Sequence, residues 1–146
     1  MVDVSTDAVI RCPVQVVARF AMDPDNAPLW YVNIAAVEWQ TPKPLRVGSR
    51  LRFVAHFLRR RLAYTYEVLE LVPDRRLRMH TAEGPFPMET TYDFESISET
   101  ECHMQLRNRG EPSGFAAVLS PFVAIAMRRA NRKDLDKLRR LLEPAA

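Results

Sequence analysis

The side chains best placed to hold or protonate a bound molecule are tyrosines, with a threonine and an asparagine beside them. Tyr64 and Tyr66 stand two residues apart in one alternating apolar–polar run, and Thr90 and Tyr92 do so in another. Residues two apart point to the same face of a strand, so these four, with Asn108 of a third run, are expected on one apolar face. A buried hydroxyl without a partner costs roughly 1–3 kcal/mol. These hydroxyls therefore need hydrogen-bond partners, which a ligand or a bound water could supply. Alternatively, the rings fill the core while the hydroxyls reach water at the edge of the sheet or backbone carbonyls.

Residues that usually carry metal or acid–base chemistry fall outside this predicted face. His56, His80 and His103 alternate onto the charged face of their runs, and none has the spacing of a metal site. The sequence also has no nucleophile elbow, phosphate-binding loop or paired inward carboxylates. Acid–base work would then fall to tyrosines, with an ordinary pKa of about 10, or to Glu89 or Arg107 if a bulge reverses their direction. We expect no metal and no cofactor.

The segment at residues 81–92 (TAEGPFPMETTY) holds an aromatic side chain between two prolines. Gly84-Pro85 turns the chain between two strands, and Pro87 cannot donate a hydrogen bond to a strand ladder. Phe86 is thus presented as a fixed apolar group, which we interpret as closing one end of a cavity. The alternative is an ordinary turn whose phenylalanine caps the core.

Most of the chain alternates apolar and polar residues with the period of two that is typical of strands. A strand is expected within residues 3–11. Two short helices follow, the first opened by Pro13 and the second carrying Leu29, Trp30 and Tyr31. Further strands are expected near residues 35–40, 50–57, 62–68, 76–81, 88–95 and 102–109. This pattern predicts one antiparallel sheet of six to seven strands with one apolar face.

The last part of the chain has the spacing of an amphipathic helix. Ser120 suits the N-cap position and Pro121 the first helical position, so we expect a short helical turn near 114–119 and a long helix over about 121–142. A single helix cannot fill the hollow of a curved sheet of this size. The pattern therefore predicts a cavity between sheet and helix, the usual setting for a ligand.

Length and composition predict a single domain over residues 1–146. The chain is 47% hydrophobic and 27% charged, as ordinary globular proteins are. No apolar run approaches the ~20 residues of a membrane span, and the N-terminus lacks a signal-peptide pattern. We therefore expect a cytoplasmic monomer or homodimer without integral membrane association. Cys12 and Cys102 are expected to be reduced, buried thiols.

The net charge of +3 comes largely from Arg59-Arg60-Arg61 at a predicted hairpin tip and from basic residues of the last helix. In that helix Asp134, Asp136 and Glu143 dilute the basic residues, which indicates a solvated face. Without interleaved stacking aromatics or a reader motif, no nucleic-acid partner is expected.

In element order and in scattered residues, the sequence resembles the START-like, or SRPBCC, superfamily, in its polyketide cyclase/dehydrase-like branch. The residues that carry the resemblance are Pro13, Phe20-Ala21-Met22-Asp23, Trp30, Val47-Gly48-Ser49-Arg50, Tyr64-Thr65-Tyr66-Glu67-Val68, Glu70, Pro73, Arg76-Leu77, Thr91-Tyr92-Asp93-Phe94 and Glu111-Pro112-Ser113-Gly114. It implies an α+β helix-grip fold, a curved antiparallel sheet around a long C-terminal helix, enclosing a hydrophobic pocket. Members bind lipids, sterols, polyketides or plant hormones, a minority catalyse cyclisation or dehydration, and others bind coenzyme Q or are chaperone-like.

Three hypotheses for function follow. The first is a protein that binds a small hydrophobic or amphipathic ligand, lipid-, polyketide- or isoprenoid-like. The second is a cyclase, aromatase or dehydratase that uses pocket tyrosines, and the third is an interaction module whose basic helix face docks an anionic partner. The predicted ligand-binding residues are Phe53, Phe57, Tyr64, Tyr66, Met79, Phe86, Met88, Thr90, Tyr92, Met104, Asn108, Phe115, Leu119 and Phe122.

Overall fold

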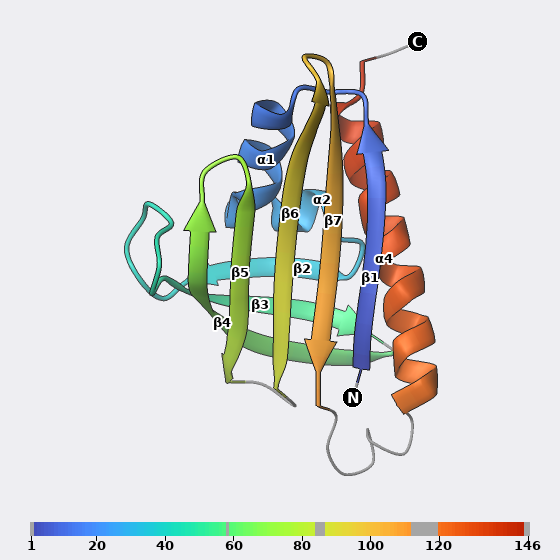
Figure 1. Cartoon of the computed structure of the whole chain (residues 1–146). Coiled ribbons are helices and arrows are strands. Elements are labelled where there is room, and N and C mark those ends of the chain that lie inside the picture. The colour runs from blue at the N-terminus through green and yellow to red at the C-terminus, as the bar shows by residue number, and fades with distance from the viewer. Residues whose placement is uncertain (1, 58, 84–86, 112–119, 145–146) are drawn as a thin grey trace.

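The computed structural model describes residues 2–57, 59–83, 87–111 and 120–144 (Figure 1). Its elements are β1 (Val2–Ile10), α1 (Val14–Met22), η1 (Pro24–Asn26), α2 (Ala27–Trp30), β2 (Ile34–Trp39), β3 (Arg50–Phe57), β4 (Arg60–Val72), β5 (Arg76–Glu83), β6 (Met88–Ser98), β7 (Glu101–Gly110) and α4 (Ser120–Leu142). The order of strands and helices is the one predicted from the sequence. The short helical turn predicted near 114–119 lies outside the described residues.

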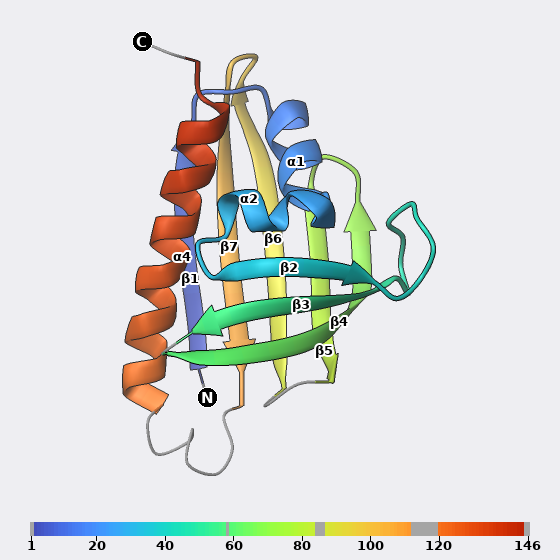
Figure 2. The ribbon, with the colours of Figure 1, turned by 180° about the vertical axis from the view of Figure 1, so that it is seen from behind.

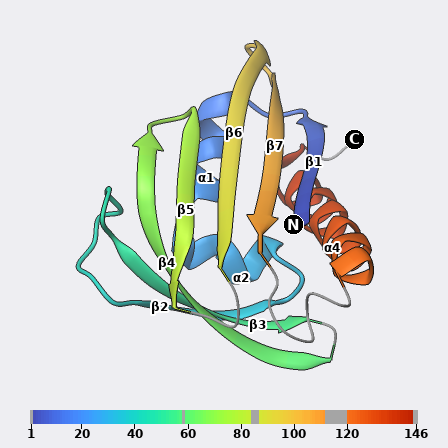
Figure 3. The ribbon, with the colours of Figure 1, turned by 60° about the horizontal axis from the view of Figure 1, so that its bottom comes forward.

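The strands form one antiparallel sheet of seven strands in the order β1-β7-β6-β5-β4-β3-β2. β4 is 13 residues long, and its pairing with β5 shifts register twice, with an extra residue in β5 at Ala82 and an extra residue in β4 at Leu69. Bulges of this kind bend a strand and increase its twist. The sheet accordingly curls until β2 and β3 run across the other strands (Figures 2 and 3). The predicted helix-grip architecture is confirmed.

The two short helices close one end of the concave face (Figure 2). Pro13 precedes α1, as its missing N–H allows. Asp23 caps the following turn, where its side chain accepts a hydrogen bond of 3.0 Å from the backbone of Asp25. Trp30 of α2 is fully buried against this end of the core, so the helices are anchored by a large aromatic group.

The long helix α4 packs against the edge strand β1 and spans the open side of the curled sheet (Figure 1). Val123, Met127, Asn131 and Leu135 recur every four residues and are all buried, which defines the inner face of the helix. Among the helices that the structure describes, none is both long enough and apolar enough to cross a bilayer.

Two side chains that were expected on the solvated face of α4 are largely removed from water. Asp134 is 2% exposed, and Glu143 accepts a hydrogen bond of 2.9 Å from the backbone N–H of Arg11. The expectation that these acidic side chains face solvent was wrong, because it was drawn from their charge and not from their position around the helix. Asp134 stands three and seven residues after Asn131 and Met127, which places it on the inner face.

Candidate functional site

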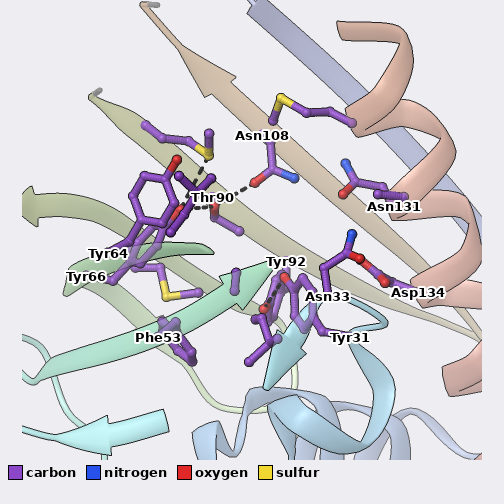
Figure 4. A pocket seen from close by; sticks show the side chains of 17 residues that line it. Tyr31, Asn33, Phe53, Tyr64, Tyr66, Thr90, Tyr92, Asn108, Asn131 and Asp134 are labelled. Atoms are coloured by element: carbon purple, nitrogen blue, oxygen red, sulfur yellow. Dashed lines mark hydrogen bonds between the residues drawn. The ribbon is translucent and has the colours of Figure 1, made fainter. Parts of the chain in front are cut away.

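A cavity of about 130 Å³ lies between the concave face of the sheet and α4. Its volume is several times the ~30 Å³ that one water occupies in the liquid, so side chains do not fill the predicted hollow. Figure 4 shows the side chains that line it. Eight of the predicted site residues are among them: Phe53, Tyr64, Tyr66, Met79, Met88, Thr90, Tyr92 and Asn108.

The other six predicted residues fall into three groups. Met104 is fully buried but is not part of the cavity wall. Phe122 was predicted to face inward and is 69% exposed; this prediction was wrong, because the inner face of α4 passes through the next residue, Val123. The side chain of Phe57 lies outside the described part of the chain, as do Phe86, Phe115 and Leu119.

One wall of the cavity is aromatic and comes from the paired strands β3 and β4. Phe53 stands opposite Tyr64 in the register, and its ring lies 5.7 Å from that of Tyr66 in an edge-on arrangement. Burial raises the pKa of Tyr64 and of Tyr66 to about 12. Both phenols are therefore protonated at neutral pH and can act as hydrogen-bond donors but not as bases.

Polar side chains of β4, β6 and β7 lie within hydrogen-bonding distance of one another along the cavity wall. Thr90 Oγ1 donates to Asn108 Oδ1 at 2.6 Å and lies 3.5 Å from the Tyr66 hydroxyl. A threonine has one hydroxyl proton, and a carbonyl oxygen can only accept, so the short bond to Asn108 takes that proton. The Tyr66 hydroxyl is in turn 3.4 Å from Met88 Sδ. The buried Tyr66 hydroxyl, which was expected to need a hydrogen-bond partner, thus finds its partners in neighbouring side chains.

A second pair of phenols lies nearer to α2. The hydroxyls of Tyr31 and Tyr92 are 2.6 Å apart, and burial raises the pKa of both well above the ordinary range. Tyr31 was not predicted as a site residue because it follows α2 in a short connection without periodicity. Asn33, from the same connection, also lines the cavity.

Asp134 brings a carboxyl group to the cavity wall from α4 (Figure 4). Burial raises its pKa to about 7, although the backbone N–H of Val32, which donates to Oδ1 at 2.7 Å, and the charge of Lys137 both act to lower it. Its pKa thus lies close to neutral pH, where a carboxyl can give or take a proton. The tyrosines were the only inward titratable groups predicted from the sequence.

Asn131 stands three residues before Asp134 on the same face of α4. It is 5% exposed, and its amide nitrogen has no hydrogen-bond partner in the described part of the chain. Figure 4 shows Asn131 and Asp134 on one side of the cavity and Tyr64 and Tyr66 on the other. The cavity is therefore amphipathic, with an aromatic wall opposite a wall of amide and carboxyl groups.

The three histidines lie away from the cavity, as predicted. His103 Nε2 is 2.8 Å from Asp7, and His80 Nε2 is 3.9 Å from Glu67, on the outer face of the sheet. Within residues 2–57, 59–83, 87–111 and 120–144, no group of three potential metal-binding side chains comes together. Cys12 and Cys102 are buried free thiols.

Residues 1–143 match the sequence profile of a family described as polyketide cyclase / dehydrase and lipid transport. Similar folds include a Thermus thermophilus protein, with 22% identity, 96% coverage of both chains and a TM-score of 0.83. A START superfamily protein from Mycobacterium smegmatis has 13% identity, 96% coverage of both chains and a TM-score of 0.84. The Zhui aromatase/cyclase of a Streptomyces species has 12% identity, covering 96% of this chain and 92% of its own, and a TM-score of 0.81. No curated protein matches the sequence. The match over nearly the whole length shows that the chain belongs to the polyketide cyclase / dehydrase and lipid transport family.

Proposed function

We propose that the protein binds a small amphipathic ligand whose ring-sized apolar part lies against Phe53, Tyr64 and Tyr66. The proposal rests above all on one observation: Asn131 lines the cavity, and its buried amide nitrogen has no hydrogen-bond partner among the described residues. A buried donor without an acceptor costs roughly 1–3 kcal/mol. A carbonyl or hydroxyl oxygen on the ligand would offset that cost.

The size of the cavity limits what can lie fully inside it. Pockets for drug-sized molecules measure roughly 300–1,000 Å³, whereas an apolar cavity of about 150 Å³ holds one benzene. The volume of about 130 Å³ therefore accommodates one ring. The rest of a longer lipid-, polyketide- or isoprenoid-like ligand would extend beyond the described walls.

Two probes of nearly equal shape test this proposal. Acetophenone carries a carbonyl oxygen next to its ring, and ethylbenzene replaces that group with a methylene. In NMR titrations we expect both to perturb signals of the cavity residues, with acetophenone bound more tightly. Asn131→Ala removes the amide, so it should weaken acetophenone about fivefold or more, as the loss of about 1 kcal/mol requires. It should not weaken ethylbenzene.

Either of two results would refute the proposed ligand class. One is that neither probe perturbs the cavity residues at saturating concentration. The other is that Asn131→Ala lowers the affinity for both probes equally, because the amide would then act through packing alone. Native mass spectrometry of the protein purified from its own source would identify a ligand that it retains.

The carboxyl group of Asp134 favours a second candidate function, acid–base catalysis of a dehydration. Loss of water from a β-hydroxyketone needs a base that removes the proton next to the carbonyl and an acid that protonates the departing hydroxyl. A carboxyl with a pKa of about 7 can take part in both proton transfers. Tyr31 and Tyr92 carry further hydroxyls along the same cavity.

A simple β-hydroxyketone tests the catalytic role. 4-Hydroxy-4-phenylbutan-2-one loses water to give a conjugated enone whose absorbance is easily followed. A catalyst should show a pH–rate profile that changes near pH 7, and Asp134→Asn should lower the rate by about 100-fold or more. If the wild-type protein gives no more enone than buffer does, this candidate function is wrong and the binding role stands alone.

A further inference from the structure

The outer face of the first three turns of α4 carries two large apolar side chains that the described residues leave exposed. Phe122 is 69% exposed and Ile125 is 54% exposed. Arg129 and Arg132 follow at seven and ten residues from Phe122, which places all four on one stripe of the helix. The stripe points away from the inner face that holds Asn131.

Among the residues that the structure describes, the basic side chains of this face have no acidic partners. Within the described part of the chain, no ion pair is found for Arg128, Arg129, Arg132 or Lys133, all of which are exposed. The arginines on the outer face of the sheet differ, because they pair with carboxylates on neighbouring strands. These pairs are Arg50–Glu67, Arg52–Glu38, Arg76–Asp93, Arg78–Glu89 and Arg107–Asp3.

The end of the β3–β4 hairpin carries further positive charge close to α4. In all three views of the ribbon it lies beside the N-terminal half of α4 (Figures 1, 2 and 3). Arg59, Arg60 and Arg61 are exposed there, and the structure shows no ion pair for them among the residues it describes. We call the basic corner the set formed by Phe122, Ile125, Arg128, Arg129, Arg132, Lys133 and Arg59–Arg61.

We propose that the basic corner docks the protein onto an anionic lipid surface. Phe122 and Ile125 would enter the boundary between headgroups and acyl chains, and the arginines and lysine would meet the lipid phosphates. Apolar groups flanked by cations on one helix face are the pattern of interfacial helices. Each basic residue near an anionic bilayer contributes a roughly fivefold gain in binding.

Other occupants fit these residues less well. A second copy placed symmetrically on this face would bring two sets of unpaired cations together. A nucleic acid would satisfy the cations, but it would leave Ile125 without an apolar partner and offers stacking only to Phe122. A lipid surface satisfies both kinds of side chain.

Docking in this way would place the cavity close to the membrane. Met127, Asn131 and Asp134 line the cavity from the inner face of the helix whose outer face carries the basic corner. Only the width of a helix, about 10 Å, separates the two faces. Docking does not require an occupied cavity, so it can be tested independently of the ligand.

Vesicle sedimentation tests the proposal with the full chain. We expect binding to phosphatidylcholine vesicles that contain about one third phosphatidylserine, weak binding to phosphatidylcholine alone, and loss of binding at high salt. Arg129→Gln with Arg132→Gln should weaken binding about fivefold for each charge removed. Phe122→Ser with Ile125→Ser should weaken it about tenfold or more.

Matched control variants remove the same groups elsewhere on the surface. Arg46→Gln with Arg75→Gln removes two exposed charges distant from α4, and Val47→Ser with Ile97→Ser removes two apolar groups that are 61% and 52% exposed. Both controls should leave vesicle binding unchanged, as should Asn131→Ala inside the cavity. That last control separates docking from ligand binding.

Three outcomes would overturn membrane docking. The first is vesicle binding that falls equally in the controls and in the basic-corner variants. The second is binding to a DNA duplex or an acidic protein, but not to the anionic vesicles. The third is sedimentation as a dimer that the Phe122→Ser, Ile125→Ser variant dissociates, because the apolar stripe would then be covered by a second copy.

Discussion

Replacing Asp134 with asparagine should change how the stability of the protein depends on pH. The carboxyl is 2% exposed, and its pKa is raised from 3.8 to about 7, first of all by burial. Between these two values the unfolded chain loses the proton and the folded chain keeps it. Stability that is fully present below about pH 4 is therefore lost as pH rises to about 7, and above pH 7 the loss stays constant.

The size of this loss follows from the two pKa values. Each pH unit between them corresponds to about 1.4 kcal/mol, so the full interval is of the order of 4 kcal/mol. Asparagine does not titrate, and its oxygen can still accept the N–H of Val32. The free energy of unfolding of Asp134→Asn relative to wild type should therefore rise by about 4 kcal/mol from pH 4 to pH 7 and then level off.

Urea unfolding at a series of pH values measures this difference, since the free energy falls linearly with urea. Taking the difference at each pH cancels the other carboxylates. Met127→Leu changes the same helix face without a titratable group and should differ from wild type by a constant amount. A constant difference for Asp134→Asn as well would refute the reasoning, because the carboxyl would then titrate alike in the folded and unfolded states.

Three further changes test the packing and the polar contacts of the site. Thr90→Val should destabilise the protein by about 1–3 kcal/mol, because it leaves the carbonyl oxygen of Asn108 without its donor; Thr90→Ser should restore most of the loss in urea unfolding. Val123→Ala should cost about 2 kcal/mol, whereas Phe122→Ala next to it should change stability by less than about 0.5 kcal/mol; equal losses would mean that Phe122 is buried. Asn131→Ala should raise the melting temperature, because it removes an unpartnered buried amide and favours the helix; a lower melting temperature would mean that the amide has a partner in solution.

The strand side of the cavity could be predicted because it depends on a simple alternation. In a sheet with one buried face, every second residue of a strand must point inward. That rule places Phe53, Tyr64, Tyr66 and Tyr92 on the concave face, where the structure has them. The pairing of β4 with β5 has one extra residue in β5, Ala82, and one in β4, Leu69, and neither lies between Tyr64 and Tyr66, so the two tyrosines keep the same direction.

The helix side was predicted less well, and the reason lies in Asp134. Its position relative to Met127 and Asn131 gives the inner face, but an aspartate in a basic segment normally faces water. What permits its burial is the backbone N–H of Val32, 102 residues earlier in the chain. No local pattern shows that the connection after α2 lies against α4. The idea that Phe86 closes the cavity stays a prediction.

The two polar side chains on the inner face of α4 indicate why the cavity exists. A helix that only covered a sheet would carry apolar residues at positions 131 and 134, because a buried carboxyl and an unpartnered amide both lower stability. Apolar groups there would fill the hollow and strengthen the core. Proteins keep such destabilising groups mostly where a ligand or a reaction needs them. The same helix leaves Phe122 and Ile125 exposed on its other face, and exposed apolar groups lower the solubility of a protein. Helix α4 thus departs from the requirements of stability on both faces, and each departure is explained if one face meets a ligand and the other a membrane.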